Sequence, residues 1–243
     1  MESVFNIEPT ELNVRRIIHD YQYDFFHTID ISNKEIYYDI INSYSTFKIK
    51  NIYKFIYIIM SLTKTPLCNY GEKAIDFSLT STENKLISLN NIKGEKGTLI
   101  MFICNHCPYV KAVIEDIVED CKNLKQLGVN SVAIMSNDTK NYPEDSFENM
   151  IKFSEKHKFN FPYLIDKDQE IAKKYNAVCT PDFFGYNSRL ELQYRGRMRE
   201  LKDLKKISSG ESDLKKAMDL ISTTDNGPKN QFPSMGCSIK WFK

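Results

Sequence analysis

The chain has 243 residues, with 33 Lys and Arg against 32 Asp and Glu, and 42% of its residues are hydrophobic. This length suffices for one large domain or a domain with an extension, and the core needs no disulfide for stability. The balanced charge provides no long-range field, so neither nucleic acid nor a membrane surface is expected as a partner.

Targeting and membrane-spanning segments are not expected either. The most apolar candidate, 52–60, falls short of the roughly 18 residues of a spanning helix and carries Lys54. The first twenty residues include four acidic side chains, which argues against a secretory or organelle signal. We therefore expect a cytoplasmic protein, in which paired cysteines are usually catalytic, redox-sensing or metal-binding.

Residues 1–62 differ in composition from the rest of the chain. They are rich in Ile, Tyr and Asn, contain Pro9 but no glycine, and show neither a helical nor a strand period. We interpret them as an N-terminal extension of unknown role. Because Met60 stands just before the regular pattern, the upstream segment is either an accessory element or the product of a mis-chosen start. The main domain is expected at 63–243.

From residue 74 onward the apolar pattern becomes regular. Short apolar runs predict strands, and apolar residues three and four apart predict helices. The expected strands are 75–79, 85–89, 98–103, 129–135, 161–165, 182–186 and 190–194, and the expected helices are 108–126, a segment after Ser146, 168–175 and 212–221. The last two strands are expected to form a hairpin. This order predicts an α/β sandwich with a mixed sheet.

The most informative motif lies where the buried strand 98–103 meets the next helix. Residues 104–107 read C-N-H-C, which is a C-x-x-C pair. In a chain without export signals, such a pair is typical of a redox dithiol rather than of a structural disulfide. Cys104 also has a second interpretation, as a buried apolar residue with no redox role, because unpaired cysteine is among the residues most often buried.

Cys107 is the expected nucleophile of this pair. Pro108 suits the first position of a helix, which places Cys107 at the helix cap, near unpaired amides and the positive end of the dipole. A free thiol with a pKa of about 8.5 is mostly protonated at neutral pH, so the thiolate needs this stabilisation, together with charge from His106 and Lys111. Cys104 is then the resolving thiol, and the two roles are exchanged if the helix begins earlier.

A second site is expected at Thr180-Pro181, just ahead of an apolar strand. A proline at a strand entrance can simply mark an edge or a turn. A cis bond would instead turn the Thr180 backbone toward an extended substrate. Cys179 and Cys237 are further candidates for the resolving thiol, although Cys237 could alternatively pack with Trp241 beneath the sheet.

These two sites resemble the thioredoxin superfamily, and in particular its redoxin branch, related to alkyl hydroperoxide reductase and thiol-specific antioxidant proteins and often called peroxiredoxin-like. The similarity spans about 66–243 and is carried by 101–110, 136–138, 142–145, 161–164, 179–184, 194–196 and 236–241. The resemblance implies a thioredoxin-like three-layer sandwich with a mixed central sheet and flanking helices. It also implies an oxidoreductase without a cofactor, acting on a disulfide-bearing protein or a small hydroperoxide, with thioredoxin or glutathione as the thiol reductant.

The sequence departs from the patterns of both related groups. Cys107 matches the first active-site cysteine of a thioredoxin, but Val110 stands where the second would be, and Met101 replaces the buried carboxylate that assists proton transfer. In a peroxiredoxin, Cys107 would be the peroxidatic cysteine. Cys104 then replaces the activating threonine, and Thr180 stands near the place of a peroxide-binding arginine. We therefore expect thiol-disulfide exchange or slow thiol peroxidase activity.

Two other functions stay open. Cys104, His106, Cys107 and Cys179 offer soft ligands to zinc or copper(I), although adjacent His106 and Cys107 do not easily turn into one tetrahedral site, and no metal is expected. The chain could also be a redox-inactive binding module on this fold. Cys121 is expected in the core, His19, His27 and His157 at the surface, and the charges at 195–199 and 202–206 in solvated turns and strand ends.

Overall fold

The computed structural model describes residues 62–242, so the expected N-terminal extension lies outside the described residues except for its last position. The strands are β1 (Leu62–Lys64), β2 (Ser78–Ser81), β3 (Leu86–Ser88), β4 (Gly97–Phe102), β5 (Val129–Met135), β6 (Tyr163–Ile165), β7 (Cys179–Thr180), β8 (Asp182–Tyr186), β9 (Leu192–Gly196), β10 (Leu201–Lys202), β11 (Lys205–Lys206) and β12 (Met235–Ser238). The helices are α3 (Leu89–Ile92), α4 (Pro108–Gln126), α5 (Phe147–Lys156), α6 (Glu170–Lys174) and α7 (Asp213–Thr224), with a 3-10 turn η1 at Pro143–Asp145. Within 62–242, no helix has both the length and the apolar character that a bilayer crossing requires.

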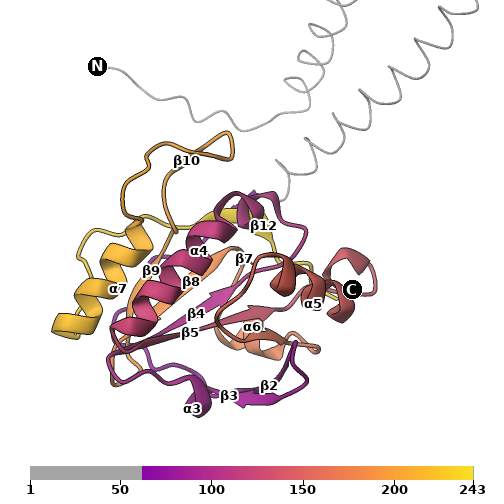
Figure 1. Cartoon of the computed structure of the whole chain (residues 1–243), viewed down its shortest axis with the longest axis horizontal. Coiled ribbons are helices and arrows are strands. Elements are labelled where there is room, and N and C mark those ends of the chain that lie inside the picture. The colour runs from indigo at the N-terminus through magenta and orange to yellow at the C-terminus, as the bar shows by residue number, and fades with distance from the viewer. Residues whose placement is uncertain (1–61, 243) are drawn as a thin grey trace, which may run out of the picture. The chain divides into compact units, whose positions relative to one another are not determined.

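A seven-stranded sheet in the order β3-β2-β6-β5-β4-β8-β9 forms the centre of the domain (Figure 1). Strand β5 runs parallel to both of its neighbours, β4 and β6, whereas the other pairs are antiparallel. All six residues of β4 are buried. This agrees with its continuous apolar run, which suits a strand covered on both faces.

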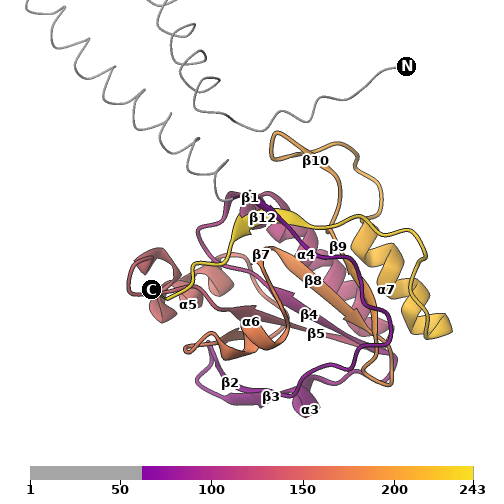
Figure 2. The same cartoon turned by 180° about the vertical axis from the view of Figure 1, so that it is seen from behind.

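Helices cover both faces of the sheet (Figures 1 and 2). Apolar side chains of α4, α5 and α7 join one buried cluster, which includes Ile114, Met150 and Met218. Those of α3 and α6 join a second cluster, which includes Leu89 and Ile171. The expected three-layer, thioredoxin-like α/β sandwich with a mixed sheet is therefore confirmed.

Helix α4 forms over the same residues that the sequence pattern predicts. Pro108 occupies its first turn and Cys107 is the N-cap residue. Its buried positions recur at spacings of three and four residues, and the expected core position of Cys121 is confirmed. Gly128, with φ +82°, follows the end of the helix, where this conformation favours glycine. The cysteine motif therefore stands at the start of a well-defined helix.

Several strand boundaries differ from those expected. Strand β6 begins at Tyr163 rather than at 161, because Pro162 has no N–H to donate to a ladder. The expected hairpin of β8 and β9 forms, but β9 begins only at Leu192, because Leu190 adopts a left-handed turn conformation with φ +57°. These differences shift strand ends without changing the topology.

The expectation of solvated charges at 195–199 is wrong. Arg195 is only 6% exposed and pairs with the fully buried Asp182 at 2.8 Å. Arg199 is also largely buried and pairs with Asp116 of α4 at 2.8 Å. His157 is half-buried and packs on Phe153, with ring centroids 4.6 Å apart, whereas His19 and His27 lie outside the described residues.

The sequence pattern also missed a small sheet beside the end of β4 that leads into the cysteine motif. Strand β12 pairs antiparallel with both β1 and β7, so the C-terminal segment returns to the second expected site (Figure 2). At Gly236 a Cβ atom would overlap the carbonyl group of Thr180. Glycine is therefore required for β12 to approach β7 so closely.

Candidate active site

Cys107 lies at the meeting point of α4 and the Thr180-Pro181 segment. Its side chain is fully buried, and its Sγ lies 3.1 Å from the carbonyl oxygen of Thr180. The Thr180-Pro181 peptide bond is cis, which is one of the two alternatives that the sequence left open. The structure therefore brings together the two sites that the sequence singled out, and the neutral Cys107 thiol donates to the Thr180 carbonyl.

The surroundings of Cys107 favour its thiolate. Burial raises the pKa of this thiol, but interactions with the Cys104 and Cys237 thiols and with the amides of Cys237 and Val110 outweigh burial and hold the pKa well below its usual range. The Val110 amide belongs to the first turn of α4, where unpaired N–H groups and the positive end of the helix dipole favour a negative charge. The stabilising donors thus come from other segments as well as from the helix.

Cys104 has the opposite character. Its sulfur lies 3.3 Å from the Thr180 hydroxyl and 3.9 Å from His106 Nδ1, and its side chain is 1% exposed. Burial, followed by the interactions with Cys107 and the charge of Asp145, holds the pKa of Cys104 well above its usual range. Cys104 is part of the core cluster, but its polar contacts distinguish it from an ordinary apolar core residue.

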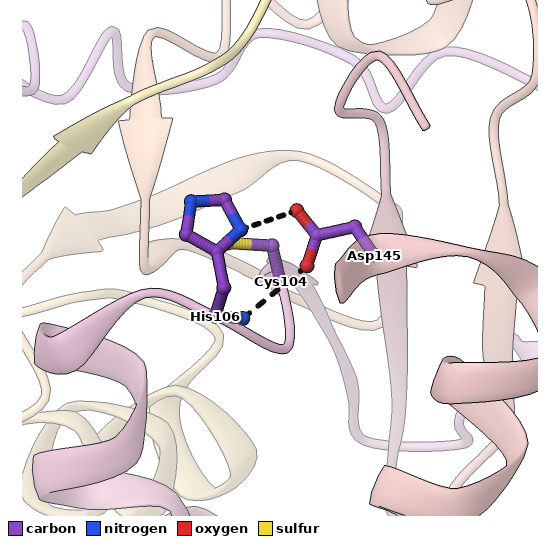
Figure 3. Close-up of side chains that lie close together, drawn as sticks. All are labelled: Cys104, His106 and Asp145. Atoms are coloured by element: carbon purple, nitrogen blue, oxygen red, sulfur yellow. Dashed lines mark hydrogen bonds and ion pairs between the residues drawn. The ribbon is translucent and has the colours of Figure 1, made fainter. Parts of the chain in front are cut away.

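His106 points toward a carboxylate that the sequence analysis did not select. Its Nδ1 lies 2.6 Å from Oδ2 of Asp145, which is completely buried (Figure 3). Burial lowers the pKa of His106, but the hydrogen bond and the charge of Asp145 outweigh it and raise this pKa. The only signal in the sequence was the stretch 142–145, where a proline precedes two acidic residues.

Asp145 is held by donors from two segments, the cysteine loop and the residue Asn137. Its Oδ1 accepts hydrogen bonds from the backbone N–H groups of Asn105, at 2.8 Å, and His106, at 3.2 Å. Its Oδ2 also accepts one from the side chain of Asn137, at 2.8 Å. The side chain of Asn105 in turn accepts a hydrogen bond from the Tyr163 hydroxyl. The buried carboxylate is therefore satisfied, and it fixes the loop that carries the cysteines.

The two other candidate thiols differ in their relation to Cys107. Cys237 is 5% exposed and its thiol interacts with Cys107, whereas Trp241 is 38% exposed. Cys179 is also buried, and its thiol donates to the Pro181 carbonyl at 3.9 Å. Burial raises the pKa of Cys179 strongly, which makes it a poor nucleophile.

The edge of β7 is arranged differently from the expected substrate-binding edge. Thr180 lies opposite Cys237 in the antiparallel pair of β7 and β12. The backbone expected to receive an extended substrate is therefore paired with the chain's own C-terminal segment. Gly236 permits this close intramolecular pairing, because it has no Cβ atom to overlap the Thr180 carbonyl.

The soft-ligand set of the competing metal-binding function does not assemble as such. The described residues place Cys104, His106 and Asp145 with their ligand atoms within 4.8 Å of one another, and Cys179 is not among them. Both Asp145 oxygens already accept hydrogen bonds, so a cation would have to displace donors that hold the loop. The arrangement suits proton transfer better than metal coordination.

Comparison with known proteins agrees with this geometry. Residues 70–200, more than half of the chain, match the model of the AhpC/TSA family. The chain belongs to the AhpC/TSA family. The matched region contains both cysteines of the 104–107 motif, Asp145 and the cis Thr180-Pro181 bond, but it ends before Cys237.

Solved structures resemble this AhpC/TSA-family chain over most of their lengths. An uncharacterized conserved protein from Geobacillus kaustophilus is 40% identical, with a TM-score of 0.72, and the match covers 74% of this chain and 96% of that one. A hypothetical protein from Sinorhizobium meliloti 1021 is 32% identical, with a TM-score of 0.69 and coverages of 74% and 98%. These matches extend the similarity beyond the fold.

A curated relative of this AhpC/TSA-family chain has a named activity. The thiol-disulfide oxidoreductase ResA from Bacillus thuringiensis subsp. konkukian is 29% identical over 122 residues, which are 50% of this chain and 66% of ResA. The chain thus spans slightly less than two thirds of this relative.

Proposed function

We propose that this AhpC/TSA-family chain catalyses thiol-disulfide exchange, with Cys107 as the nucleophile and Cys104 as the resolving thiol. The observation that carries this proposal is the placement of the two thiols: Cys107 is the N-cap residue of α4 and lies against the Thr180 carbonyl, and Cys104 lies against the Thr180 hydroxyl. The pKa of Cys107 is held low and that of Cys104 is held high. Such a contrast separates an attacking thiolate from a thiol that stays protonated until it is needed.

The proposed reaction has two exchange steps. The Cys107 thiolate attacks one sulfur of a substrate disulfide, forms a mixed disulfide and releases the other sulfur as a thiolate, which then takes a proton. Cys104 loses its proton and attacks the Cys107 sulfur, which releases the second substrate thiol and leaves a Cys104–Cys107 disulfide. Two electrons thus pass to the substrate. A thiol reductant such as thioredoxin or glutathione, in a reducing compartment such as the cytoplasm, restores the dithiol.

A disulfide suits this site better than a hydroperoxide. Fast cleavage of an O–O bond would require groups that polarise it, but the Thr180 hydroxyl lies against Cys104. Arg195 is committed to a buried ion pair with Asp182. A hydroperoxide is therefore proposed only as a slow substrate, with a Cys107 sulfenate that Cys104 resolves.

Disulfide mapping by mass spectrometry tests this proposal. After mild oxidation, the wild-type protein should contain a Cys104–Cys107 disulfide, and Cys104→Ser exposed to oxidised glutathione should retain glutathione on Cys107. Insulin reduction should be lost in Cys107→Ser and retained in the matched control Cys68→Ser, whose thiol is half-buried on a loop. Modification of Cys179 or Cys237, with Cys104 and Cys107 unmodified, would contradict the proposal.

Metal analysis of the same preparation tests the competing function. Thiol-disulfide exchange predicts turnover by protein that contains no stoichiometric zinc or copper. A bound metal that survives dialysis, is lost in Cys104→Ser and accompanies absent turnover would instead favour a metal-binding role.

A further inference from the structure

The His106–Asp145 pair lies beside the thiol that must leave when the proposed disulfide is opened. His106 Nδ1 is 2.6 Å from Asp145 Oδ2 and 3.9 Å from Cys104 Sγ, which is within hydrogen-bonding range for sulfur (Figure 3). Met101 is fully buried on β4 and cannot exchange a proton. The His106–Asp145 pair can therefore exchange a proton with Cys104, which Met101 on β4 cannot do.

The surroundings of His106 favour its protonated form. Asp145 is the dominant partner, and Glu144, Cys104, Cys107 and Tyr142 are further titratable groups near the ring. Tyr142 stacks on the ring, with centroids 5.8 Å apart and planes at 9°. The histidine side chain is 21% exposed, so it can exchange protons with solvent, whereas Asp145 is closed off.

Opening of the Cys104–Cys107 disulfide requires a proton at Cys104. A reductant thiolate attacks Cys107, and Cys104 is the leaving sulfur. A thiol with a raised pKa is a poor leaving group as a thiolate, and the charge of Asp145 disfavours an anion there further. Protonation of Cys104 during bond cleavage removes this difficulty.

We propose that His106 is the catalytic acid that protonates Cys104 as the disulfide opens. Asp145 is the residue that positions His106 and favours its protonated form. This inference rests on the proposed function. The reductant sulfur forms a bond to Cys107 Sγ, the bond between Cys107 and Cys104 breaks, and its electron pair goes to Cys104. The His106 Nδ1 proton moves to Cys104, which leaves a neutral imidazole that solvent reprotonates. In the reverse direction, the imidazole accepts the Cys104 proton when Cys104 attacks a mixed disulfide.

Stopped-flow reduction by dithiothreitol tests this role. Mass spectrometry first establishes that each variant contains the Cys104–Cys107 disulfide, because its absence from the wild type would refute the proposed function rather than this inference. His106→Asn should then lower the rate constant at neutral pH by about a hundredfold. The matched control His157→Asn, at the end of α5, should leave the rate constant unchanged.

The pH profile separates an acid from a structural residue. When the wild-type rate constant is divided by the thiolate fraction of dithiothreitol, it should fall as pH rises through the pKa of His106. His106→Asn should lose this fall, and Asp145→Asn should move it to lower pH, because the neighbouring negative charge is gone. Parallel normalised profiles in the wild type and His106→Asn, or an unchanged midpoint in a folded Asp145→Asn, would overturn the inference.

Discussion

Cys237 of β12 lies directly opposite Thr180 of β7, so a C-terminal thiol and the carbonyl that contacts Cys107 belong to the same antiparallel pair. The C-terminal strand thus covers Cys107, the proposed nucleophile, while supplying interactions that favour its thiolate. A substrate polypeptide that uses the Thr180 backbone must first displace β12. Access to Cys107 and its reactivity are therefore linked through one short strand.

Gly236→Ala should uncover Cys107. The added Cβ would overlap the Thr180 carbonyl, and overpacking of this kind costs about 1–3 kcal/mol, which the displacement of β12 relieves. At a pH high enough to ionise Cys107 in both proteins, so that the loss of thiolate stabilisation by β12 does not affect the comparison, the alkylation rate of Cys107 by iodoacetamide, followed by mass spectrometry, should rise by about tenfold or more. The matched control Gly210→Ala adds a Cβ in ordinary contact with Ser208 and should not change this rate. An unchanged rate in Gly236→Ala would mean that β12 does not limit access.

Cys237→Ala should raise the pKa of Cys107. The substitution removes a thiol that stabilises the Cys107 thiolate but keeps the backbone amide of residue 237, so the thiolate loses part of its support. A titration of the ultraviolet thiolate absorbance, assigned with Cys107→Ser, should show a higher midpoint than the wild type. Cys68→Ala provides the control for loss of a thiol elsewhere. If the wild type, Cys237→Ala and Cys68→Ala share one midpoint, the Cys237 thiol does not lower the pKa of Cys107.

The sequence predicted those features whose determinants are local. Helix α4 and its cap were predicted because Pro108 starts the helix, apolar residues follow a helical period and Gly128 ends it. The strand β4 was predicted because it is a continuous apolar run. Both place Cys104 and Cys107 correctly, so the core of the candidate site could be located without the structure.

Features that depend on pairing between distant segments could not be predicted. Asp145 reaches the cysteine loop from 39 residues away, and its short 3-10 turn has no periodic pattern. Strand β12 has only four residues, and its pairing with β7 depends on one glycine. The sequence favours a solvated Arg195, because charges at strand ends are usually exposed, but Asp182 on the neighbouring strand neutralises it in the interior.

Asp120→Asn should change how stability depends on pH. Burial raises the pKa of Asp120 on α4 to about 6, despite the hydrogen bond donated by Ser212. The unfolded chain binds this proton only below about pH 4, so the stability of the wild type should fall as pH rises from about 4 to 6 and stay lower above that. Asparagine does not ionise and still accepts from Ser212.

Thermal unfolding should therefore show that the stability of Asp120→Asn relative to the wild type increases from about pH 4 to pH 7, by up to about 2 kcal/mol. Asp203→Asn, in the exposed turn between β10 and β11, is the matched control and should follow the wild type at both pH values. Equal pH dependence in Asp120→Asn and the wild type would show that burial does not raise this pKa.

Arg195→Met should destabilise the fold strongly. It leaves the fully buried Asp182 without the guanidinium that lies 2.8 Å away, and removal of one member of a buried pair costs about 3–5 kcal/mol. Burial already raises the pKa of Asp182 to about 6, so the loss should be greater at high pH, where the carboxylate is charged.

The double variant Asp182→Leu with Arg195→Met should recover much of the stability in urea unfolding, because it leaves no unpaired charge. Arg189→Met, which removes the exposed ion pairs of Arg189 with Glu191 and Asp225, should change stability little. Similar losses in the two single variants would contradict the role of burial.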